Sequence, residues 1–335
     1  MPLVPMRQLL NEAAKGNYAV GAYNVNNMEQ IQAIMQAAQG TRSAVIVQAS
    51  RGALQYSNFT YLKKLMEAAV EENPDIPIAL HLDHGNSLET VKKAIGIGFT
   101  SVMIDGSLKE DSKTPTTFEE NVEVTCAVTD YSHPMGITVE GELGTLGGIE
   151  DGVGSGRVQL TDPDQAVEFV EKTRVDALAV AIGTSHGAYK FKAEPKLALH
   201  IVEEIHERLP ELHMVMHGSS SVPQELVEIV NRYGGNMPNA KGVPMSEIQS
   251  VIPYGVRKVN IDSDGRIAVT GAIRKVFIET PEKFDPRDYM KPARAALAEL
   301  VAQKMHDLGT AGSADTFKPQ SLEDMKAFYR EKGWI

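Results

Sequence analysis

Residues 78–106, IALHLDHGNSLETVKKAIGIGFTSVMIDG, combine in one segment the elements that recur along the whole chain. The apolar run Ile78–Leu82 has the length of a strand and ends at the polar pair Asp83 and His84. Apolar residues then recur at three- and four-residue spacing over Leu88–Ile95, which predicts a helix, and a second strand-sized run, Ser101–Ile104, follows. Because parallel neighbouring strands need a crossover connection, this order predicts a parallel pair.

The strand–helix order repeats from the start of the chain to about residue 280. The predicted strands are Tyr18–Val25, Ala44–Ala49, Ile78–Leu82, Ser101–Ile104, Ile137–Glu142, Ala177–Ile182, His213–Met216 and Lys258–Ile261. The predicted helices between and after them are Met28–Ala38, Leu62–Glu72, Leu88–Ile95, Phe118–Thr129, Pro163–Lys172, Pro195–Leu209, Pro223–Tyr233 and Arg266–Phe277. An α/β chain with eight such units is typical of a closed TIM (β/α)8 barrel, whereas an open sheet rarely needs eight evenly spaced units.

The repeat ends at Phe284-Asp285-Pro286-Arg287. Two further helices are predicted after it, at Asp288–Leu308 and Leu322–Lys332. We expect these additional C-terminal helices to pack on the barrel. Residues 1–335 are therefore predicted to form a single (β/α)8 barrel domain, with 281–335 as a C-terminal helical extension.

The composition narrows the class of function. The 335 residues include 33 Lys and Arg against 44 Asp and Glu, a formal net charge of −11. Such an acidic chain is not expected to bind nucleic acid or an anionic membrane, although a few local groups can still hold a small anion. The one cysteine, Cys126, excludes an intrachain disulfide and favours the cytoplasm. No apolar run approaches the ~20 residues that a membrane span needs.

Polar residues gather where the predicted strands end. His84, His186 and His217 follow different strands, and barrel closure brings these ends together. Three facing imidazoles are typical of catalytic zinc with an open fourth position, although any one of them could instead be an ordinary hydrogen-bonded histidine. Asp83 could move a proton next to such a metal, or could only support a ligand. Asp105, Glu140 and Glu142 make a second metal position plausible, and Glu140 and Glu142 share one face of a strand.

Two small-residue loops favour phosphate binding over simple helix capping. Residues 218–221 (GSSS) precede a predicted helix, and so do residues 260–265 (NIDSDG). Small residues let backbone amides approach an anion, and loops after the seventh and eighth strands of such barrels frequently hold phosphate. A third stretch, Gly144–Gly156, carries Glu150 and has the glycine content of either a mobile lid or an inert loop.

A Lewis-acidic metal, a proton-carrying carboxylate and phosphate loops together suit carbon–carbon bond cleavage beside a carbonyl in a phosphorylated sugar. The alternative lysine imine route needs a lysine at a strand end. Lys258 instead opens the eighth predicted strand, and Lys190 lies in a loop beyond His186. The sequence therefore favours metal chemistry.

The same stretches resemble, in order, the motifs of class II fructose-1,6-bisphosphate aldolases, from near the N-terminus to about Arg287. The matching segments are 20–26 (VGAYNVN), 48–52 (QASRG), 82–85 (LDHG), 103–107 (MIDGS), 139–144 (VEGELG), 183–187 (GTSHG), 217–221 (HGSSS) and 259–262 (VNID). The stretch between Gly147 and Thr161 is shorter than in the Calvin-cycle branch and nearer the length in tagatose-bisphosphate aldolases.

The resemblance implies a role for each matching residue. It implies that His84, His186 and His217 hold catalytic Zn²⁺, with Asp105 and Glu142 at a second divalent position. Asp83 would serve as acid/base at the C4 hydroxyl, and Glu150 would exchange the proton on the dihydroxyacetone phosphate carbon. Ser50 would contact glyceraldehyde 3-phosphate, and Arg287 would bind its phosphate, in some relatives from a neighbouring subunit. The implied binders of the dihydroxyacetone phosphate group are Gly187, Gly218, Ser219, Ser220, Asn260, Ile261, Asp262 and Ser263.

The implied reaction is the reversible cleavage of fructose 1,6-bisphosphate to dihydroxyacetone phosphate and glyceraldehyde 3-phosphate through a zinc-stabilised enediolate. It implies a lyase of glycolysis, gluconeogenesis or the Calvin cycle, a homodimer or homotetramer, and a monovalent cation (Na⁺ or K⁺) near the phosphate. The alternatives are a tagatose 1,6-bisphosphate aldolase with the same mechanism, a zinc hydrolase, and a phosphosugar-binding protein without turnover.

Overall fold

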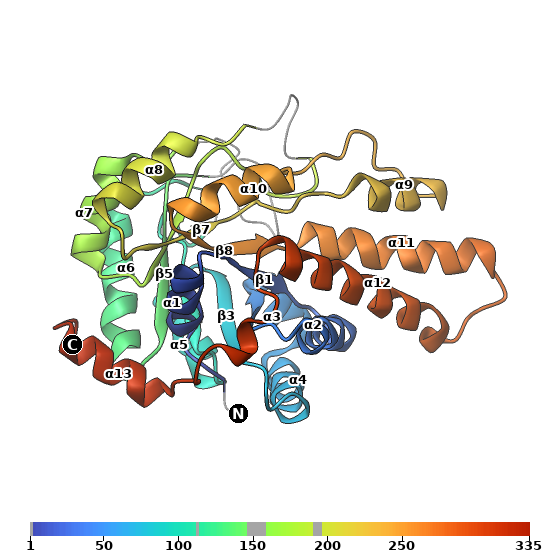
Figure 1. Cartoon of the computed structure of the whole chain (residues 1–335), viewed down its shortest axis with the longest axis horizontal. Helices are drawn as coiled ribbons and strands as arrows, with labels where there is room; N and C mark the ends of the chain where they lie inside the picture. Colours follow the sequence, from blue (N-terminus) through green and yellow to red (C-terminus); the bar gives the residue numbers. More distant parts are fainter. Residues whose placement is uncertain (1–2, 112–113, 146–158, 190–195) are drawn as a thin grey trace.

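The chain folds into a closed barrel of parallel strands in the order β1 to β8 (Figure 1). The computed structural model describes residues 3–111, 114–145, 159–189 and 196–335. The strands are β1 (Val20–Asn24), β2 (Val45–Ser50), β3 (Ile78–Gly85), β4 (Ser101–Ile104), β5 (Thr138–Leu143), β6 (Ala177–Val180), β7 (His213–Met216) and β8 (Val256–Ile261). The predicted TIM barrel is therefore confirmed, and every predicted strand is present.

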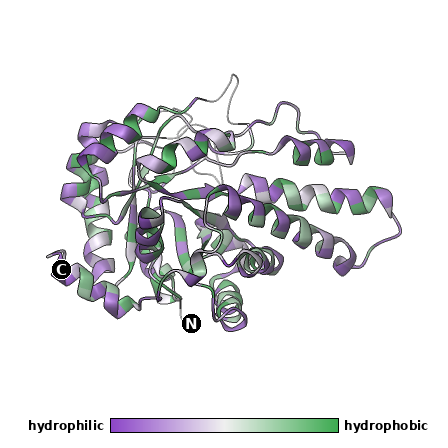
Figure 2. Cartoon of the chain, viewed as in Figure 1, coloured by the Kyte–Doolittle hydropathy of each residue, from purple (hydrophilic) through white to green (hydrophobic). Residues whose placement is uncertain are grey.

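Helices cover the outside of the barrel, with hydrophobic and hydrophilic residues alternating along them (Figure 2). The α-helices are α1 (Met6–Gly16), α2 (Met28–Thr41), α3 (Arg51–Ser57), α4 (Phe59–Glu72), α5 (Leu88–Gly96), α6 (Phe118–Ser132), α7 (Pro163–Thr173), α8 (Leu199–Arg208), α9 (Gln224–Arg232), α10 (Met245–Val251), α11 (Ser263–Glu279), α12 (Pro286–Asp307) and α13 (Leu322–Glu331), and the short 3-10 turns are η1 (His133–Met135), η2 (Ile252–Tyr254) and η3 (Ser313–Asp315). None of the helices in the described ranges is both long and apolar enough to cross a membrane.

Local sequence explains where several helices begin. The Thr117 side chain accepts a hydrogen bond from the Glu120 amide while the Glu120 side chain accepts one from the Thr117 amide, so the two residues form a reciprocal cap on α6. The Asp162 side chain caps α7, which begins at Pro163. A boundary differs at β8, which begins at Val256 rather than at the predicted Lys258.

Helix α1, which the sequence analysis did not predict, closes one end of the barrel. Its residues Met6, Leu9, Leu10 and Ala13 are buried in one cluster with residues of several strands, including Ile46. These side chains exclude water from the end of the barrel at which the strands begin. The opposite end, at which the strands finish, holds the pocket described below.

Helices α12 and α13 lie against the rest of the chain. Leu297, Val301 and Met305 of α12 belong to the same buried cluster as the outward-facing strand residues. Helix α13 docks through the buried Tyr329, whose hydroxyl hydrogen-bonds the carboxylate of Asp176 at 3.0 Å. On this basis we propose that residues 281–335 belong to the barrel domain and that 1–335 form a single domain.

Candidate active site

A pocket opens at the carboxyl end of the barrel, where the predicted site residues were expected to meet. The space among its lining residues amounts to about 500 Å³ and includes open solvent at its mouth. Its described lining residues are Asn24, Ser50, Arg51, Gly52, Asp83, His84, His186, His217, Gly218, Ser219, Ser220, Asn260 and Asp262. These residues come from segments far apart in the sequence, so closure of the barrel creates the pocket.

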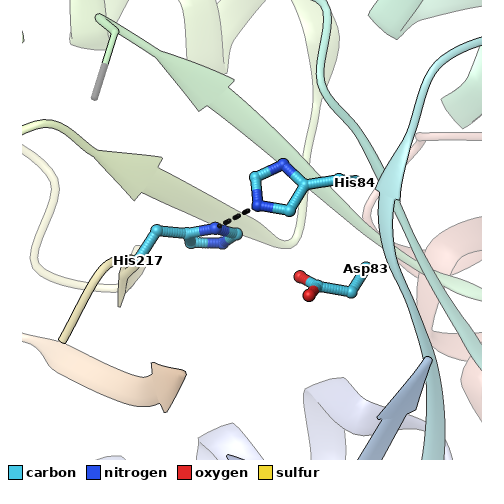
Figure 3. A group of neighbouring side chains, drawn as sticks. All are labelled: Asp83, His84 and His217. Atoms are coloured by element: carbon cyan, nitrogen blue, oxygen red, sulfur yellow. Dashed lines mark hydrogen bonds between the residues drawn. The ribbon is translucent and has the colours of Figure 1, made fainter. Parts of the chain in front are cut away.

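The end of β3 supplies two adjacent functional side chains. Successive strand residues normally point to opposite faces, but the pairing of β3 with β4 shifts register between Leu82 and Gly85. Within that irregularity His84 has a φ of 49°, in the left-handed region that non-glycine residues rarely adopt. Asp83 and His84 consequently both contribute to one cluster (Figure 3). Such strain is typical of functional sites, because the surrounding structure must stabilise it.

The three predicted histidines lie in this pocket. Nε2 of His84 is 3.1 Å from Nδ1 of His217, and the two rings meet edge to face (Figure 3). The His186 ring centroid lies 5.2 Å from that of His84 and 6.4 Å from that of His217. Potential ligand atoms of Asp83, His84 and His217 all lie within 4.8 Å of one another, which is close enough to bind one metal ion. His186 is next to this group but is not part of it.

A second group of potential ligands surrounds the other nitrogen of His84. Nδ1 of His84 is 3.3 Å from Asp105 and 3.9 Å from Glu142, and ligand atoms of the three residues lie within 4.8 Å of one another. Burial and the neighbouring Asp105 raise the pKa of Glu142 well above its ordinary value. Oε2 of Glu142 is buried and accepts no hydrogen bond from a described residue. A divalent cation would satisfy this oxygen and offset the crowded negative charge, so the donor set fits a metal.

His217 is held by a buried charged network behind the pocket. Its Nε2 lies 2.8 Å from Oε1 of Glu140, whose other oxygen is 2.9 Å from Nζ of Lys258. Burial, together with the nearby His84 and Lys258, lowers the pKa of His217 well below its ordinary value, so its ring is neutral. The single ring proton is therefore on Nε2, facing Glu140, which leaves the Nδ1 lone pair directed at His84 and able to bind a metal.

Asp83 is anchored by three amide side chains. It accepts hydrogen bonds from Asn24 at 3.1 Å, from Gln48 at 3.4 Å and from Asn260 at 3.2 Å. Burial alone would raise the pKa of Asp83, but His84 and the other nearby cationic and amide groups outweigh it and lower the pKa. Asp83 is therefore an ionised carboxylate that faces the pocket and can accept a proton.

The loops after β7 and β8 form another wall of the pocket. Gly218 has a φ of 58°, and a Cβ at this position would lie 2.6 Å from the Ser185 carbonyl oxygen, so only glycine fits. The Ser219 hydroxyl donates to the Asn260 carbonyl at 3.0 Å, and the Asp262 amide donates to the Ser220 hydroxyl at 3.2 Å. These bonds join the two loops in which the sequence analysis predicted phosphate binding.

The remaining predicted residues differ in position. Ser50 lines the pocket, and its hydroxyl caps α3 by accepting from the Ala53 amide. Ile261 is buried in the hydrophobic core, whereas Ser263 begins α11 and Gly187 directly follows His186; none of these three lines the pocket described above. The structure does not bring Arg287 to this pocket, and Glu150 lies outside the described residues.

Arg287 instead lies near the start of α12. Its guanidinium is exposed and pairs with Asp285 at the same helix end. It borders a separate depression formed with the first residues of α2, including Met28. Arg287 therefore does not face the pocket of its own chain. It could contact a ligand there only if α12 were placed differently, or it could contact a ligand in the pocket of another subunit.

Comparison with known proteins identifies the family. The family model described as "Fructose-bisphosphate aldolase class-II" matches residues 4–313. The chain belongs to the class II fructose-bisphosphate aldolase family. It is 57% identical over 332 residues to a fructose-bisphosphate aldolase of Giardia intestinalis, covering 98% of this chain and 100% of that protein. It is 53% identical over 344 residues to one of Nostoc commune, covering 98% and 96%.

A solved structure agrees with this assignment. The YdjI aldolase of Escherichia coli K12 superposes with a TM-score of 0.75 at 28% identity, covering 93% of this chain and 100% of that chain. The protein is therefore an aldolase of the class II type, a metal-dependent family that acts on phosphorylated sugars. These matches favour the aldolase over the hydrolase and the binding protein considered above, and they give no added support to the tagatose alternative.

Several residues of this class II site were not predicted as functional. Asn24 is the last residue of β1 and could be recognised as a polar strand end, whereas Gln48 and Lys258 lie within β2 and β8. The available signal was a polar residue inside an apolar run, because such a residue must face a polar barrel interior. Both Gln48 and Lys258 are fully buried in the structure. Lys258 was predicted to open the eighth strand. It lies instead inside β8, where it pairs with Glu140.

Proposed function

We propose that this class II aldolase reversibly cleaves fructose 1,6-bisphosphate to dihydroxyacetone phosphate and glyceraldehyde 3-phosphate. The observation that carries the proposal is the cluster of Asp83, His84 and His217 at the mouth of the barrel. It combines imidazole and carboxylate donors with a pocket that opens at the carboxyl end of the barrel. Relatives at more than half identity over nearly the whole chain bear the name fructose-bisphosphate aldolase, which supports this substrate.

The proposed metal is Zn²⁺, held by His84, His186 and His217, with a second divalent position at Asp105 and Glu142. When bound, zinc would supply a Lewis acid that draws electron density from the substrate carbonyl. The Glu140 contact supports the assignment of His217, because it fixes the tautomer that a metal ligand needs. We also propose a monovalent cation, Na⁺ or K⁺, beside the phosphate.

In the cleavage direction, Asp83 accepts the proton of the C4 hydroxyl while the C3–C4 bond breaks and C4 becomes the aldehyde carbon of glyceraldehyde 3-phosphate. The electron pair left at C3 is delocalised toward the C2 carbonyl, and Glu150 returns a proton to C3. Condensation reverses each transfer. The three amides that hydrogen-bond Asp83 support its role, because they keep its carboxylate in one orientation toward the pocket.

The loops after β6, β7 and β8 are proposed to hold the dihydroxyacetone phosphate group, and Ser50 to contact glyceraldehyde 3-phosphate. Support comes from the small residues Gly218, Ser219 and Ser220, which line the pocket and let a ligand approach the backbone. The full proposed set for the first phosphate is Gly187, Gly218, Ser219, Ser220, Asn260, Ile261, Asp262 and Ser263.

We further propose that the protein acts in the cytoplasm as a homodimer or homotetramer. The α11–α12 hairpin extends away from the barrel (Figure 1), and Ile278 and Phe284 at its end are 60% and 90% exposed. Phe277, 46% exposed, lies near the same end, and exposed apolar side chains that gather in one place are typical of an interface. In such an assembly Arg287, which lies near the same end, would reach the second phosphate in the pocket of a neighbouring subunit.

An assay of triose phosphate formation from fructose 1,6-bisphosphate tests the proposal. We expect turnover that is lost on treatment with a strong chelator and restored by Zn²⁺ or Co²⁺. A parallel assay with tagatose 1,6-bisphosphate should give a lower kcat/KM. Chelator-resistant turnover would exclude the metal mechanism, release of inorganic phosphate would indicate a hydrolase, and a higher kcat/KM for tagatose 1,6-bisphosphate would exclude the proposed substrate.

A further inference from the structure

The loop that follows β7 contains a strained turn behind the pocket. Val222 has a φ of 49°, which is rare for any side chain and costly for a β-branched one. The buried carboxylate of Asp264 fixes this turn. It accepts hydrogen bonds from the Val222 amide at 2.7 Å, the Ser221 amide at 3.0 Å and the Ser221 hydroxyl at 3.1 Å.

A lysine of the C-terminal extension completes this arrangement. Nζ of Lys304, on α12, lies 3.0 Å from Asp264 and donates a hydrogen bond to the Ser221 hydroxyl at 2.5 Å. The Lys304 and Asp264 side chains are 5% and 0% exposed, so neither charge is screened by water. Removing one partner of such a buried pair leaves the other charge uncompensated, so Asp264 depends on Lys304 for its place behind the loop.

The turn is directly connected to the pocket wall. Ser221 follows Ser220, which lines the pocket and whose hydroxyl accepts a hydrogen bond from the Asp262 amide of the loop after β8. A change in the peptide orientation at 221–222 would therefore move Ser220 and its partner. Backbone groups bind an anion well only when they are already oriented toward it.

We propose that Lys304, acting through Asp264, is a positioning residue that sets the affinity of the loop after β7 for the substrate phosphate. Neither Lys304 nor Asp264 lines the pocket, so both act through Ser221 and Val222 rather than by touching the ligand. This inference rests on the proposed function, in which this loop binds phosphate. It assigns the C-terminal extension a part in substrate binding in addition to its packing role.

The test compares Lys304→Met with the wild-type enzyme and with Lys304→Arg, which keeps the charge. We expect Lys304→Met to raise both the KM for fructose 1,6-bisphosphate and the inhibition constant of inorganic phosphate by about tenfold or more, the scale on which a displaced binding group acts. kcat should stay within about threefold, and Lys304→Arg should restore most of the affinity. A purely structural lysine would instead lower the active fraction, so that kcat falls while KM and the inhibition constant stay unchanged; that result would overturn the proposal.

Two further variants keep the result interpretable. Lys172→Met is the matched control, because Lys172 is an exposed lysine that pairs with Glu168 near the end of α7; its KM should equal that of the wild type. If Lys304→Met does not fold, Ser221→Ala removes the hydroxyl that bridges Lys304 and Asp264, and an unchanged KM in that variant overturns the proposal.

Failure of the proposed function would be recognised separately. A wild-type enzyme without turnover of the bisphosphate would refute the substrate assignment. The role of Lys304 would then be decided by the dissociation constant of inorganic phosphate, measured by calorimetry on the wild type and Lys304→Met. Equal dissociation constants, or binding by neither protein, would refute the positioning role.

Discussion

The carboxylate of Glu140 accepts a hydrogen bond from Nε2 of His217 at 2.8 Å, deeper in the barrel than the pocket. This contact joins two layers of the site, because the opposite nitrogen of the same ring faces His84 at 3.1 Å. Glu140 is itself paired with the buried Lys258 at 2.9 Å. The network therefore keeps a negative charge next to the proposed metal ligand without leaving that charge unpaired in the barrel interior.

Replacing Glu140 by Gln should weaken zinc binding by about 10- to 100-fold, the usual effect of losing the partner of a metal-ligating histidine. The reason is that an amide no longer fixes the ring proton of His217 as strongly. A competition titration with a chromophoric chelator measures the change. Glu168→Gln, on an exposed glutamate of α7, is the control and should bind zinc like the wild type.

Because Glu140→Gln leaves Lys258 buried without its anionic partner, a loss of stability could imitate a loss of zinc. The double variant Glu140→Gln/Lys258→Met removes both charges and should recover much of the stability but not the zinc affinity. Wild-type zinc affinity in the double variant would contradict the role assigned to Glu140.

The sequence was sufficient to predict that His84, His186 and His217 gather in one pocket. Each follows a strand that the apolar runs locate, and the carboxyl ends of parallel barrel strands necessarily meet. The same reasoning predicted a second metal position from Asp105, Glu140 and Glu142, and the structure brings Asp105 and Glu142 beside His84. These predictions depend only on strand order and on alternation within a strand, which are local properties.

The contacts that tune the site were not predictable in this way. The bond between Glu140 and His217 joins β5 to the end of β7, and the Glu140–Lys258 pair joins β5 to β8. No local pattern specifies which buried polar residues of separate strands meet inside a closed barrel. The left-handed backbone of His84 depends likewise on the register shift between β3 and β4. Short helices such as α3 lack the length over which helical periodicity is recognised.

Asp83→Ala should lower kcat by about 10²- to 10⁴-fold, as expected for loss of a general acid/base. The imidazole ligands would remain, so zinc content measured by atomic emission should change little. A steady-state assay of bisphosphate cleavage gives kcat for both proteins. Undiminished turnover would refute the role of Asp83, whereas loss of bound zinc along with activity would indicate that Asp83 serves mainly as a ligand.

Treatment with borohydride in the presence of fructose 1,6-bisphosphate should leave the protein mass unchanged. An imine mechanism needs an uncharged lysine that can reach the substrate. The described residues that line the pocket include no lysine, and Lys258 is fully buried with Nζ held 2.9 Å from Glu140. Intact-mass spectrometry provides the measurement. A reduced adduct on any lysine would contradict the metal mechanism directly.

His213 should make the folded protein less stable in acid. Burial, together with the nearby Arg7, lowers its pKa from 6.5 to about 3, while its Nε2 hydrogen-bonds Asn11 at 2.7 Å. The unfolded chain binds this proton near pH 6.5 and the folded protein only near pH 3, so protonation favours unfolding. The contribution of the neutral His213 to the free energy of unfolding is thus complete above about pH 6.5. As the pH falls from there toward 3, the free energy of unfolding decreases by up to about 1.4 kcal/mol per pH unit.

Urea unfolding of the wild type and of His213→Gln between pH 7 and pH 4 measures this contribution. The variant lacks the titrating ring, so its free energy of unfolding should fall less steeply with decreasing pH, whatever the substitution costs at pH 7. His306→Gln is the matched control, because His306 is exposed on α12 and its replacement should preserve the wild-type slope. Parallel curves for His213→Gln and the wild type would mean that His213 does not take up its proton on unfolding in this pH range.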